Sequence, residues 1–437
     1  MPHFRPILVV VTALLLGVAP VMAQMDPDVL AGIEAEMQDI RELELKDPIN
    51  VATILQADYS SQAVDDLDVD YPPDERAQDT RILVAFGLLP PDQDLGEAYV
   101  ELLGGSVAGY YDPYTGEMVI VSLGASDEFG AFDQVTYAHE TVHALQDQNF
   151  DLAALLDSEQ AMTTDESLAL RALVEGDATV AELDFLLLDP TLAREYLAEV
   201  QDMDLDAGVL DDLPPFLVGT LMFPYDQGYE FAQFLHDEGG WDLINAAYDD
   251  LPASSEQVLH PEKYLAGELP IAVEVADHSS LLGADWTEID QDTLGEFVIS
   301  IILGESELSA SQVERAANGW GGDAYSVIAS DDELAVTWET VWDTEQDATE
   351  FARAMTIREA GRMGVTPTTD GHTTLLAADD VVVQISQDGT TVSYVQAPTV
   401  EDLDVLVGAA MPTGTPVAFM PGSGALVETS RRSEDAA

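Results

Sequence analysis

The sequence predicts an α+β protein in which a helix-rich first part precedes a smaller module of strands and helix. Apolar residues recur at helical spacing through most of residues 24–321. In residues 322–420 the pattern changes to alternating apolar and polar residues, which is typical of strands. Two short apolar runs separated by turn residues add one β-hairpin to the first part. We therefore expect two structural units with different proportions of helix and strand.

Residues 1–23 have the pattern of a secretory signal peptide. Arg5 precedes a long apolar run, and Val21-Met22-Ala23 offers small residues for cleavage after Ala23. The run is close to the shortest length that spans a bilayer, so an uncleaved anchor is the less favoured alternative. We expect an exported chain, secreted or held in the cell envelope, with no stable membrane partner beyond this segment.

Residues 24–100 form a predicted helical N-terminal part, whose segments PDVLAGIEAEMQDIRELEL, RAQDTRILVAFGLL and LGEAYVELLGG have helical apolar spacing. This part is either a permanent component of the fold or a removable pro-segment. The hairpin follows, with the strands VAGYY and EMVIV on either side of Asp112-Pro113 and Thr115-Gly116. Two strong helices come next, at about 133–148 and over ESLALRALVEGDATVAELDFLLL, and residues 216–265 are predicted to be largely helical.

The C-terminal module at 322–420 combines the predicted strands ELAVTWETVW and DVVVQISQDGTTVSYV with the helix DATEFARAMTIREA. Asp388-Gly389 lies between two alternating runs and predicts a hairpin turn. Trp338 and Trp342 lie four residues apart in a strand-like run, so they face one side and are expected in the core. Residues 421–437 are predicted to be a disordered tail.

Acidic residues dominate the charge of this chain. It has 14 Lys+Arg and 84 Asp+Glu, a formal net charge of −70, yet 47% of its residues are hydrophobic. This combination indicates a folded protein with an acidic surface whose self-repulsion is screened by salt, so we expect a salty working environment. Nucleic acid and anionic membranes are excluded as partners, because no basic patch is present to neutralise phosphates.

The sequence His139-Glu140-Thr141-Val142-His143 is an HExxH motif on the first of the two strong helices. Positions i and i+4 stack on one helical face, so both imidazoles can reach one ion. Glu140 lies about 100° around the helix, close enough to address a water on that ion without binding the ion itself. The alternative is an ordinary amphipathic helix that carries two histidines.

A catalytic zinc ion needs three protein ligands and one open position for water. Cysteine is absent, so the third ligand must be a histidine or a carboxylate. Glu175 is the first candidate, because it lies on the next helix and an antiparallel return places that helix beside the motif. The rival ligands are Asp147, Asp177, His236 and His260, of which Asp147 and Asp177 also suit a role in orienting an imidazole.

The stretch YAHETVHALQDQNFDL, with ALVEGDA downstream, resembles the gluzincin branch of the zincin metallopeptidases. More narrowly, it resembles a group of secreted bacterial and archaeal proteins with an HExxHALQDQ helix. The resemblance extends over about residues 50–350 and includes the blocks GYYDPYTGEMVIV, FPYDQGYEFAQFLHDEGGW, SSEQVLHPEKY and GWGGDAY. It implies a zincin-like fold for residues 24–321 and a zinc-dependent hydrolase.

The resemblance also implies roles for single residues. His139, His143 and Glu175 would bind Zn²⁺, while Glu140 would polarise the zinc-coordinated water and pass its proton to the leaving amine. The strand Glu117–Ser122 would form the edge of the cleft and pair with an extended peptide. Known gluzincins have a supporting Asp farther along the ligand-bearing helix, whereas here Asp177 comes only two residues after Glu175.

This chemistry also needs a hydrogen-bond donor for the oxyanion. His260 is our first choice, since it precedes Pro261 and is expected on a loop, and Tyr264 is the second. Tyr225 and Tyr229 are further candidates, and for each of these residues taken singly the alternative is that it caps a turn or packs in the core.

These observations predict an exported, salt-adapted zinc metallopeptidase that acts on a peptide or protein substrate. Two alternatives stay open. The same zinc site acts on a bond other than a peptide bond, or the protein is a non-catalytic envelope protein that uses the fold for binding or structure. The intact Glu140 argues against the second alternative, because a structural metal site needs ligands but no base.

Overall fold

The structure, a computed structural model, describes residues 25–90, 93, 95–96, 98–100, 107–122, 129–202 and 213–410. The predicted signal peptide and C-terminal tail lie outside these residues. The fold is mixed α+β, as predicted, with 58% helix and 18% strand. None of the helices in the described residues combines the length and the apolar character needed to cross a membrane.

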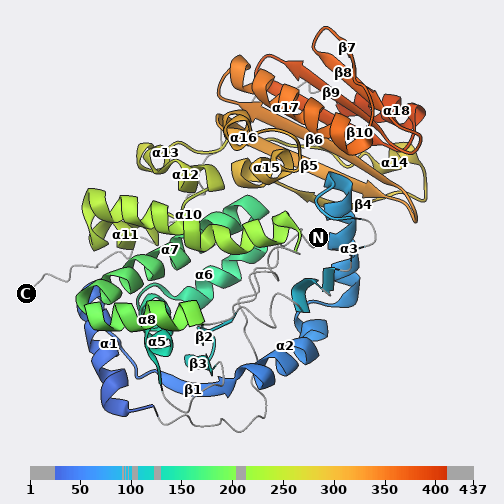
Figure 1. The fold of residues 1–437 in the computed structure, drawn as a ribbon. Coiled ribbons are helices and arrows are strands. Elements are labelled where there is room, and N and C mark those ends of the chain that lie inside the picture. Colours follow the sequence, from blue (N-terminus) through green and yellow to red (C-terminus); the bar gives the residue numbers. More distant parts are fainter. Residues whose placement is uncertain are drawn as a thin grey trace, which may run out of the picture.

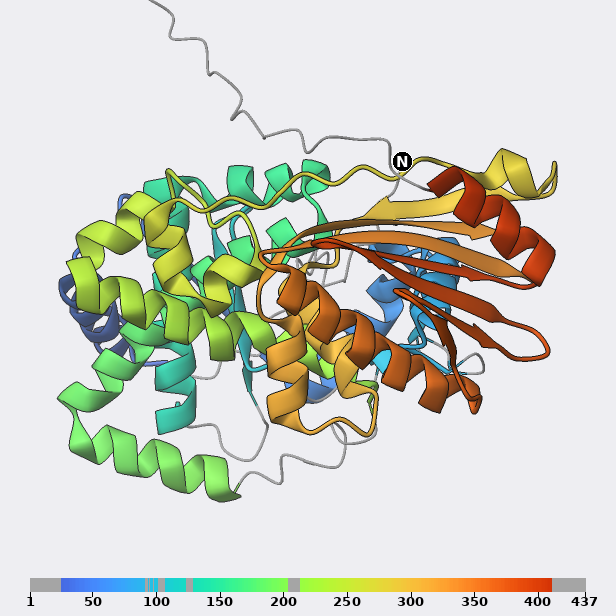
Figure 2. The same ribbon diagram turned by 90° about the horizontal axis from the view of Figure 1, so that it is seen from above.

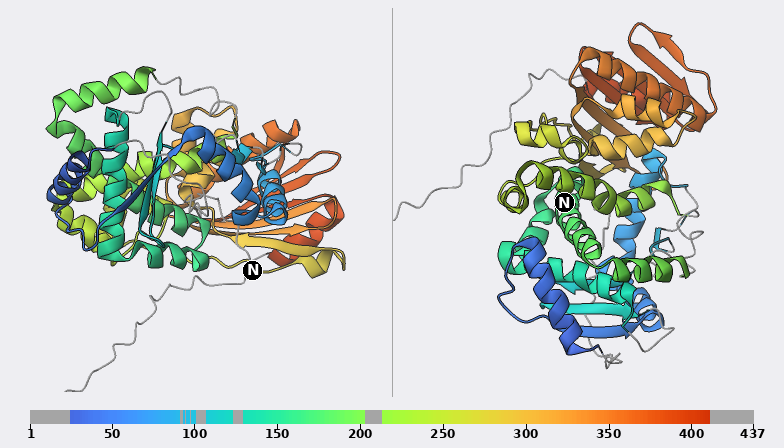
Figure 3. Two further views of the ribbon diagram at one scale, coloured as in Figure 1. Left: turned by 90° about the horizontal axis from the view of Figure 1, so that it is seen from below. Right: turned by 60° about the vertical axis from the view of Figure 1, so that its left-hand side comes forward.

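Three long helices form the centre of the first part (Figure 1): α5 (Ala131–Phe150), α7 (Thr164–Leu188) and α10 (Pro215–Gly239). Around them lie α1 (Pro27–Arg41), α6 (Leu152–Ser158), the 3₁₀ turn η1 (Glu159–Ala161), α8 (Pro190–Asp202), α11 (Trp241–Ala247), α12 (Ser255–Leu259) and α13 (Pro261–Ala266). Helix α7 begins with a capping box, in which Thr163 and Glu166 satisfy each other's backbone N–H groups. Figure 3 shows α1 lying alongside α5.

Helices α7 and α10 approach unusually closely at a pair of glycines. A Cβ atom on Gly176 would lie 2.0 Å from the carbonyl oxygen of Gly228, and one on Gly228 would lie 2.4 Å from that of Ala172. Only glycine permits this contact between two helical backbones. The contact brings the middle of α10 against the part of α7 that carries Glu175.

A small sheet lies beneath these helices, with the strand order β1-β3-β2 in the described residues. Strands β2 (Gly109–Asp112) and β3 (Glu117–Ser122) form the predicted hairpin, and β1 (Asn50–Leu55) runs parallel to β3. The prediction that Glu117–Ser122 is an edge strand is wrong, because β1 pairs along its whole length. The edges are β1 and β2.

The described C-terminal residues contain a seven-stranded antiparallel sheet of order β4-β5-β6-β10-β9-β8-β7. Its strands are β4 (Thr287–Asp292), β5 (Trp320–Ala329), β6 (Leu334–Trp342), β7 (Thr368–Asp370), β8 (Thr373–Ala377), β9 (Val382–Asp388) and β10 (Thr391–Ala397). The turn at Asp388-Gly389 joins β9 to β10, as predicted, with Gly389 at φ 60°. Because β4 and the start of β5 precede residue 322, the sheet begins earlier than the predicted module.

Helices cover both faces of this sheet (Figure 2). One face packs against α15 (Gly295–Gly304) and α17 (Glu345–Met363), with α16 (Ala310–Ala317) beside them, and the other packs against α14 (Ser279–Leu282) and α18 (Val400–Ala410). Trp338 and Trp342 are 0% and 1% exposed, which confirms their predicted place in the core.

The N-terminal part is integrated into both halves of the molecule. Helix α2 (Gln56–Asp70) lies next to the small sheet, and α3 (Pro73–Phe86) packs on the seven-stranded sheet beside α17. Phe86 at the end of α3 meets Tyr325 and Trp338 edge-on, with ring centroids 5.0 and 5.9 Å away. Removing residues 24–100 would therefore expose core surface, which argues against a removable pro-segment.

Candidate metal centre

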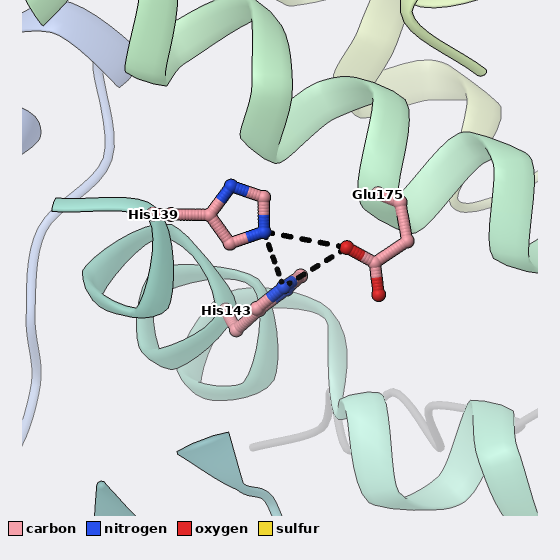
Figure 4. A group of neighbouring side chains, drawn as sticks. All are labelled: His139, His143 and Glu175. Carbon is pink, nitrogen blue, oxygen red and sulfur yellow. Dashed lines mark hydrogen bonds and ion pairs between the residues drawn. The ribbon is translucent and has the colours of Figure 1, made fainter. Parts of the chain in front are cut away.

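Three side chains from two helices converge on one point (Figure 4). The Nε2 atoms of His139 and His143, both on α5, lie 3.2 Å apart. The Oε2 atom of Glu175 on α7 lies 3.3 Å from the first nitrogen and 3.4 Å from the second. The structure therefore brings together the three residues that the sequence analysis selected as metal ligands. Their side chains are 11–19% exposed, so the point of convergence is accessible to solvent.

The other ring nitrogen of each imidazole, Nδ1, also has a hydrogen-bond partner. His139 Nδ1 lies 2.9 Å from Glu182 Oε2, two helical turns beyond Glu175 on α7. His143 Nδ1 lies 2.8 Å from Gln146 Oε1, one turn further along α5. Because both partners are acceptors, each Nδ1 carries a proton and donates it, and each neutral ring then presents a lone pair at Nε2. Two nitrogen lone pairs and a carboxylate oxygen thus face one another and need a positive charge between them.

The pKa shifts of His139 and Glu175 lead to the same conclusion. Burial lowers the pKa of His139, but hydrogen bonds with Glu175 and Glu182 outweigh it and raise the pKa well above its usual range. Burial alone would raise the pKa of Glu175, yet the two histidines hold it far below its usual range. A proton or a metal ion between these atoms is therefore stabilised.

The distances fit a tetrahedral metal ion. Zinc binds imidazole nitrogen and carboxylate oxygen at about 2.0–2.2 Å, which separates neighbouring ligand atoms by about 3.3–3.5 Å in a tetrahedron. The observed separations are 3.2, 3.3 and 3.4 Å. Among the described residues, the side chains that meet here and could bind a metal are His139, His143 and Glu175.

Glu140 follows His139 on α5 and is buried, with 7% of its surface exposed. Burial raises the pKa of its carboxyl group, His143 and His139 lower it, and Glu175 adds a second upward effect. A backbone hydrogen bond with Tyr111 on β2 also acts on this carboxylate. Glu140 is thus a buried carboxylate next to His139, beside the three converging side chains.

Tyr225 is the second group beside the ligands. Its ring centroid lies 6.3 Å from that of His139, and it lies close enough to Glu175 for the charge of that carboxylate to act on its hydroxyl. The negative charge of Glu175 raises the pKa of the Tyr225 hydroxyl well above its usual range, so the hydroxyl stays protonated and is a hydrogen-bond donor. Tyr225 lies on α10, and the close contact of α10 with α7 at Gly176 and Gly228 brings it near Glu175.

The other predicted oxyanion donors have partners elsewhere. His260 Nε2 lies 3.0 and 3.1 Å from the two carboxylate oxygens of Glu296 on α15. The hydroxyl of Tyr264 donates to the backbone oxygen of Asp250 at 2.8 Å, and Tyr229 packs against the core. The structure thus brings Tyr225, rather than His260 or Tyr264, to the candidate metal centre.

The rival ligands also lie outside the three-residue group. Asp147 accepts a hydrogen bond from the hydroxyl of Tyr111 at 2.9 Å and does not orient an imidazole. His236 packs on the ring of Trp241, with centroids 4.5 Å apart. Asp177 is fully buried and pairs with Arg41, with 2.6 Å between Oδ1 and the arginine Nε.

Gln146 and Glu182, which orient the two imidazoles, were not predicted from the sequence. Both follow a ligand on its own helix, Gln146 by one turn and Glu182 by two, so helical spacing was a usable signal. Arg41 was also missed, and no local pattern marks it, because its partner Asp177 is far away in the sequence.

A second acidic group surrounds a lysine. Glu256, Glu268 and Asp343 form it, and Lys263 Nζ lies 2.7, 2.7 and 2.9 Å from their carboxylate oxygens. The ammonium group therefore occupies the place that a metal ion would take.

Comparisons with known proteins bear on the C-terminal half only. Residues 282–407 match a family described as a domain of unknown function (DUF8575). The match spans the seven-stranded sheet from β4 to β10 and includes most of α18, but does not reach α5 or α7. No curated protein and no solved structure matches the chain. This chain is thus similar to that family in its C-terminal sheet module.

Proposed function

We propose that this protein is an exported, salt-adapted zinc metallopeptidase with a zincin-like first part. The observation that carries the proposal is the convergence of two imidazole lone pairs and one carboxylate oxygen, with Glu140 beside them. Both rings are oriented by acceptors at Nδ1, which is the usual support of metal-binding histidines. Three ligands and a neighbouring base suit hydrolysis better than a structural metal site.

In this proposal His139, His143 and Glu175 would hold zinc, and the bound ion would supply a water of lowered pKa and a Lewis acid for the carbonyl group of the substrate. Glu140 accepts a proton from the attacking water and delivers it to the leaving amine. Tyr225 donates its hydroxyl hydrogen to the carbonyl oxygen as negative charge develops there.

A peptide is the substrate that the neighbouring strand favours. Strand β2 is an edge strand of the described small sheet, and the Tyr111 backbone hydrogen bond with Glu140 places it next to the base. The edge of a sheet can bind an extended peptide as an added strand. Strand β2 thus replaces β3 as the proposed surface for peptide binding.

Removal of the metal is the direct test of this proposal. At high salt, the protein without residues 1–23 is expected to cleave members of a mixed-peptide library, and a zinc chelator is expected to stop cleavage. One equivalent of zinc restores it, because the three ligands lose no covalent structure when the ion leaves. A protein that binds one zinc but has no hydrolytic activity would favour the alternative of a non-catalytic envelope protein. A protein that cleaves only non-peptide bonds would favour the alternative of a zinc hydrolase with a different substrate.

Tyr225→Phe is expected to lower kcat by about 10²–10³-fold, the usual effect of losing one oxyanion donor, with little change in KM. The ring and its packing against His139 remain, so only the hydroxyl is removed. Steady-state kinetics on one peptide measures the effect. The matched control is Tyr264→Phe, which removes the hydroxyl bonded to Asp250. Equal losses in the two variants would contradict a specific role for Tyr225.

A further inference from the structure

We infer that Arg41 on α1 holds His143 in its metal-binding orientation, acting through Asp177 and Gln146. The inference rests on the proposed metal site. It adds to that site a series of side-chain contacts, here called the positioning chain, that begins at Arg41 in helix α1 and ends at His143. Taken over the whole residue, each member of this series, from Arg41 to His143, is at most 8% exposed. Each link is a hydrogen bond or an ion pair between side chains.

The first link sets the direction of the Gln146 amide. Its Nε2 donates to the backbone oxygen of Val174 at 2.9 Å and to Asp177 Oδ2 at 3.0 Å. Both amide hydrogens are thereby used, so Oε1 is left to face His143 Nδ1 at 2.8 Å. The imidazole must therefore be protonated at Nδ1 and present Nε2 to the metal position.

The second link fixes the carboxylate of Asp177, which is fully buried. Arg41 donates to Oδ1 from Nε at 2.6 Å and to Oδ2 from Nη2 at 3.2 Å, a two-point contact that sets the plane of the carboxylate. The hydroxyl of Tyr248 donates to Oδ2 at 2.7 Å. The oxygen that receives the Gln146 amide is thus the one on which Arg41 and Tyr248 also act.

The third link anchors the arginine itself. Its Nη2 donates to Asn245 Oδ1 at 2.7 Å, and its guanidinium carbon lies 4.6 Å from the ring centroid of Trp241, both on α11. The guanidinium therefore has one position, set by two elements other than its own helix. A pair that served packing alone would not need its carboxylate to share an oxygen with a ligand-orienting amide. Helix α1 is consequently part of the metal centre.

Three variants of the full-length protein test this series of contacts. Gln146→Leu keeps the volume but breaks the link to His143, and Arg41→Lys keeps the charge but loses the two-point contact. The matched control is Arg358→Met, which breaks another buried ion pair, that of Arg358 with Glu359 near the seven-stranded sheet. The zinc dissociation constant is measured by chelator competition. Without zinc, and at a pH high enough to keep the imidazole neutral, nitrogen-15 NMR of labelled histidines reports the tautomer of His143.

Gln146→Leu is expected to raise the zinc dissociation constant by about 10–100-fold, the usual effect of losing a group that orients a ligand. Arg41→Lys is expected to raise it by a smaller factor, and Arg358→Met to lower the melting temperature without changing zinc affinity. In the metal-free Gln146→Leu protein, the proton of His143 no longer stays on Nδ1.

Parental zinc affinity in both test variants, together with an unchanged tautomer, would overturn the inference. So would a loss of affinity in Arg358→Met as large as in Arg41→Lys, because destabilisation alone would then explain the effect. A parent protein that cleaves no peptide, while zinc affinity and tautomer respond as expected, contradicts the proposed peptidase function and supports the positioning chain.

Discussion

Glu140→Gln is expected to lower kcat/KM for peptide cleavage by about 10²–10⁴-fold while the protein keeps its zinc. Glutamine has the shape of glutamate but does not accept a proton, so the water loses its base and the leaving amine loses its acid. The three ligands are untouched. The substitution thus separates proton transfer from metal binding, which no change at His139, His143 or Glu175 can do.

The measurement combines peptide cleavage at high salt with zinc content determined on the same sample. Glu166→Gln is the matched control, because its side chain accepts the Thr163 N–H at 2.7 Å and glutamine accepts the same bond. The control is expected to retain parental activity. A Glu140→Gln protein that holds one zinc and cleaves at the parental rate would show that Glu140 is not the base.

Much of this site was predictable from local sequence. The spacing of His139 and His143 places two imidazoles on one face of any α-helix, and Glu175 follows from the antiparallel return of the next helix. The oxyanion donor was not predictable in this way. His260 was preferred because it precedes proline, whereas Tyr225 reaches the site through a contact between α7 and α10 at two glycines. Such a contact depends on which helices pack together, and helical periodicity does not reveal that.

In the fold, as in the site, features set by neighbouring residues were predictable, and contacts between residues far apart in the sequence were not. Turn residues predicted both hairpins, β2–β3 and β9–β10, because a tight turn fixes the pairing of its own strands. The pairing of β1 with β3 joins residues far apart in the sequence, and it made the predicted edge strand a central one. Strand β4 likewise joins the C-terminal sheet from before the predicted boundary at residue 322. Alternation shows that a segment is a strand but not which strand is its neighbour.

The N-terminal part allows a stability prediction of similar size to the catalytic one. Phe86→Ala is expected to lower the free energy of unfolding by about 3–5 kcal/mol, the usual loss for a buried aromatic ring in a core. Phe86 is 4% exposed and contacts Tyr325 and Trp338 edge-on. The substitution removes both aromatic contacts and leaves a cavity between α3 and the seven-stranded sheet.

Denaturant unfolding at high salt measures the loss, since salt screens the self-repulsion of a chain with a net charge of −70. Phe86→Leu is the matched control, because leucine fills much of the same volume and is expected to cost clearly less than alanine. A loss below about 1 kcal/mol in Phe86→Ala would mean that α3 contributes little to the core. The pro-segment alternative would then regain support, since a removable segment must leave without unfolding what remains. A loss of the full expected size would place α3 in the mature protein, because Phe86 is buried against the seven-stranded sheet. The same reasoning applies to α1, because Arg41 is buried against Asp177 at the metal centre.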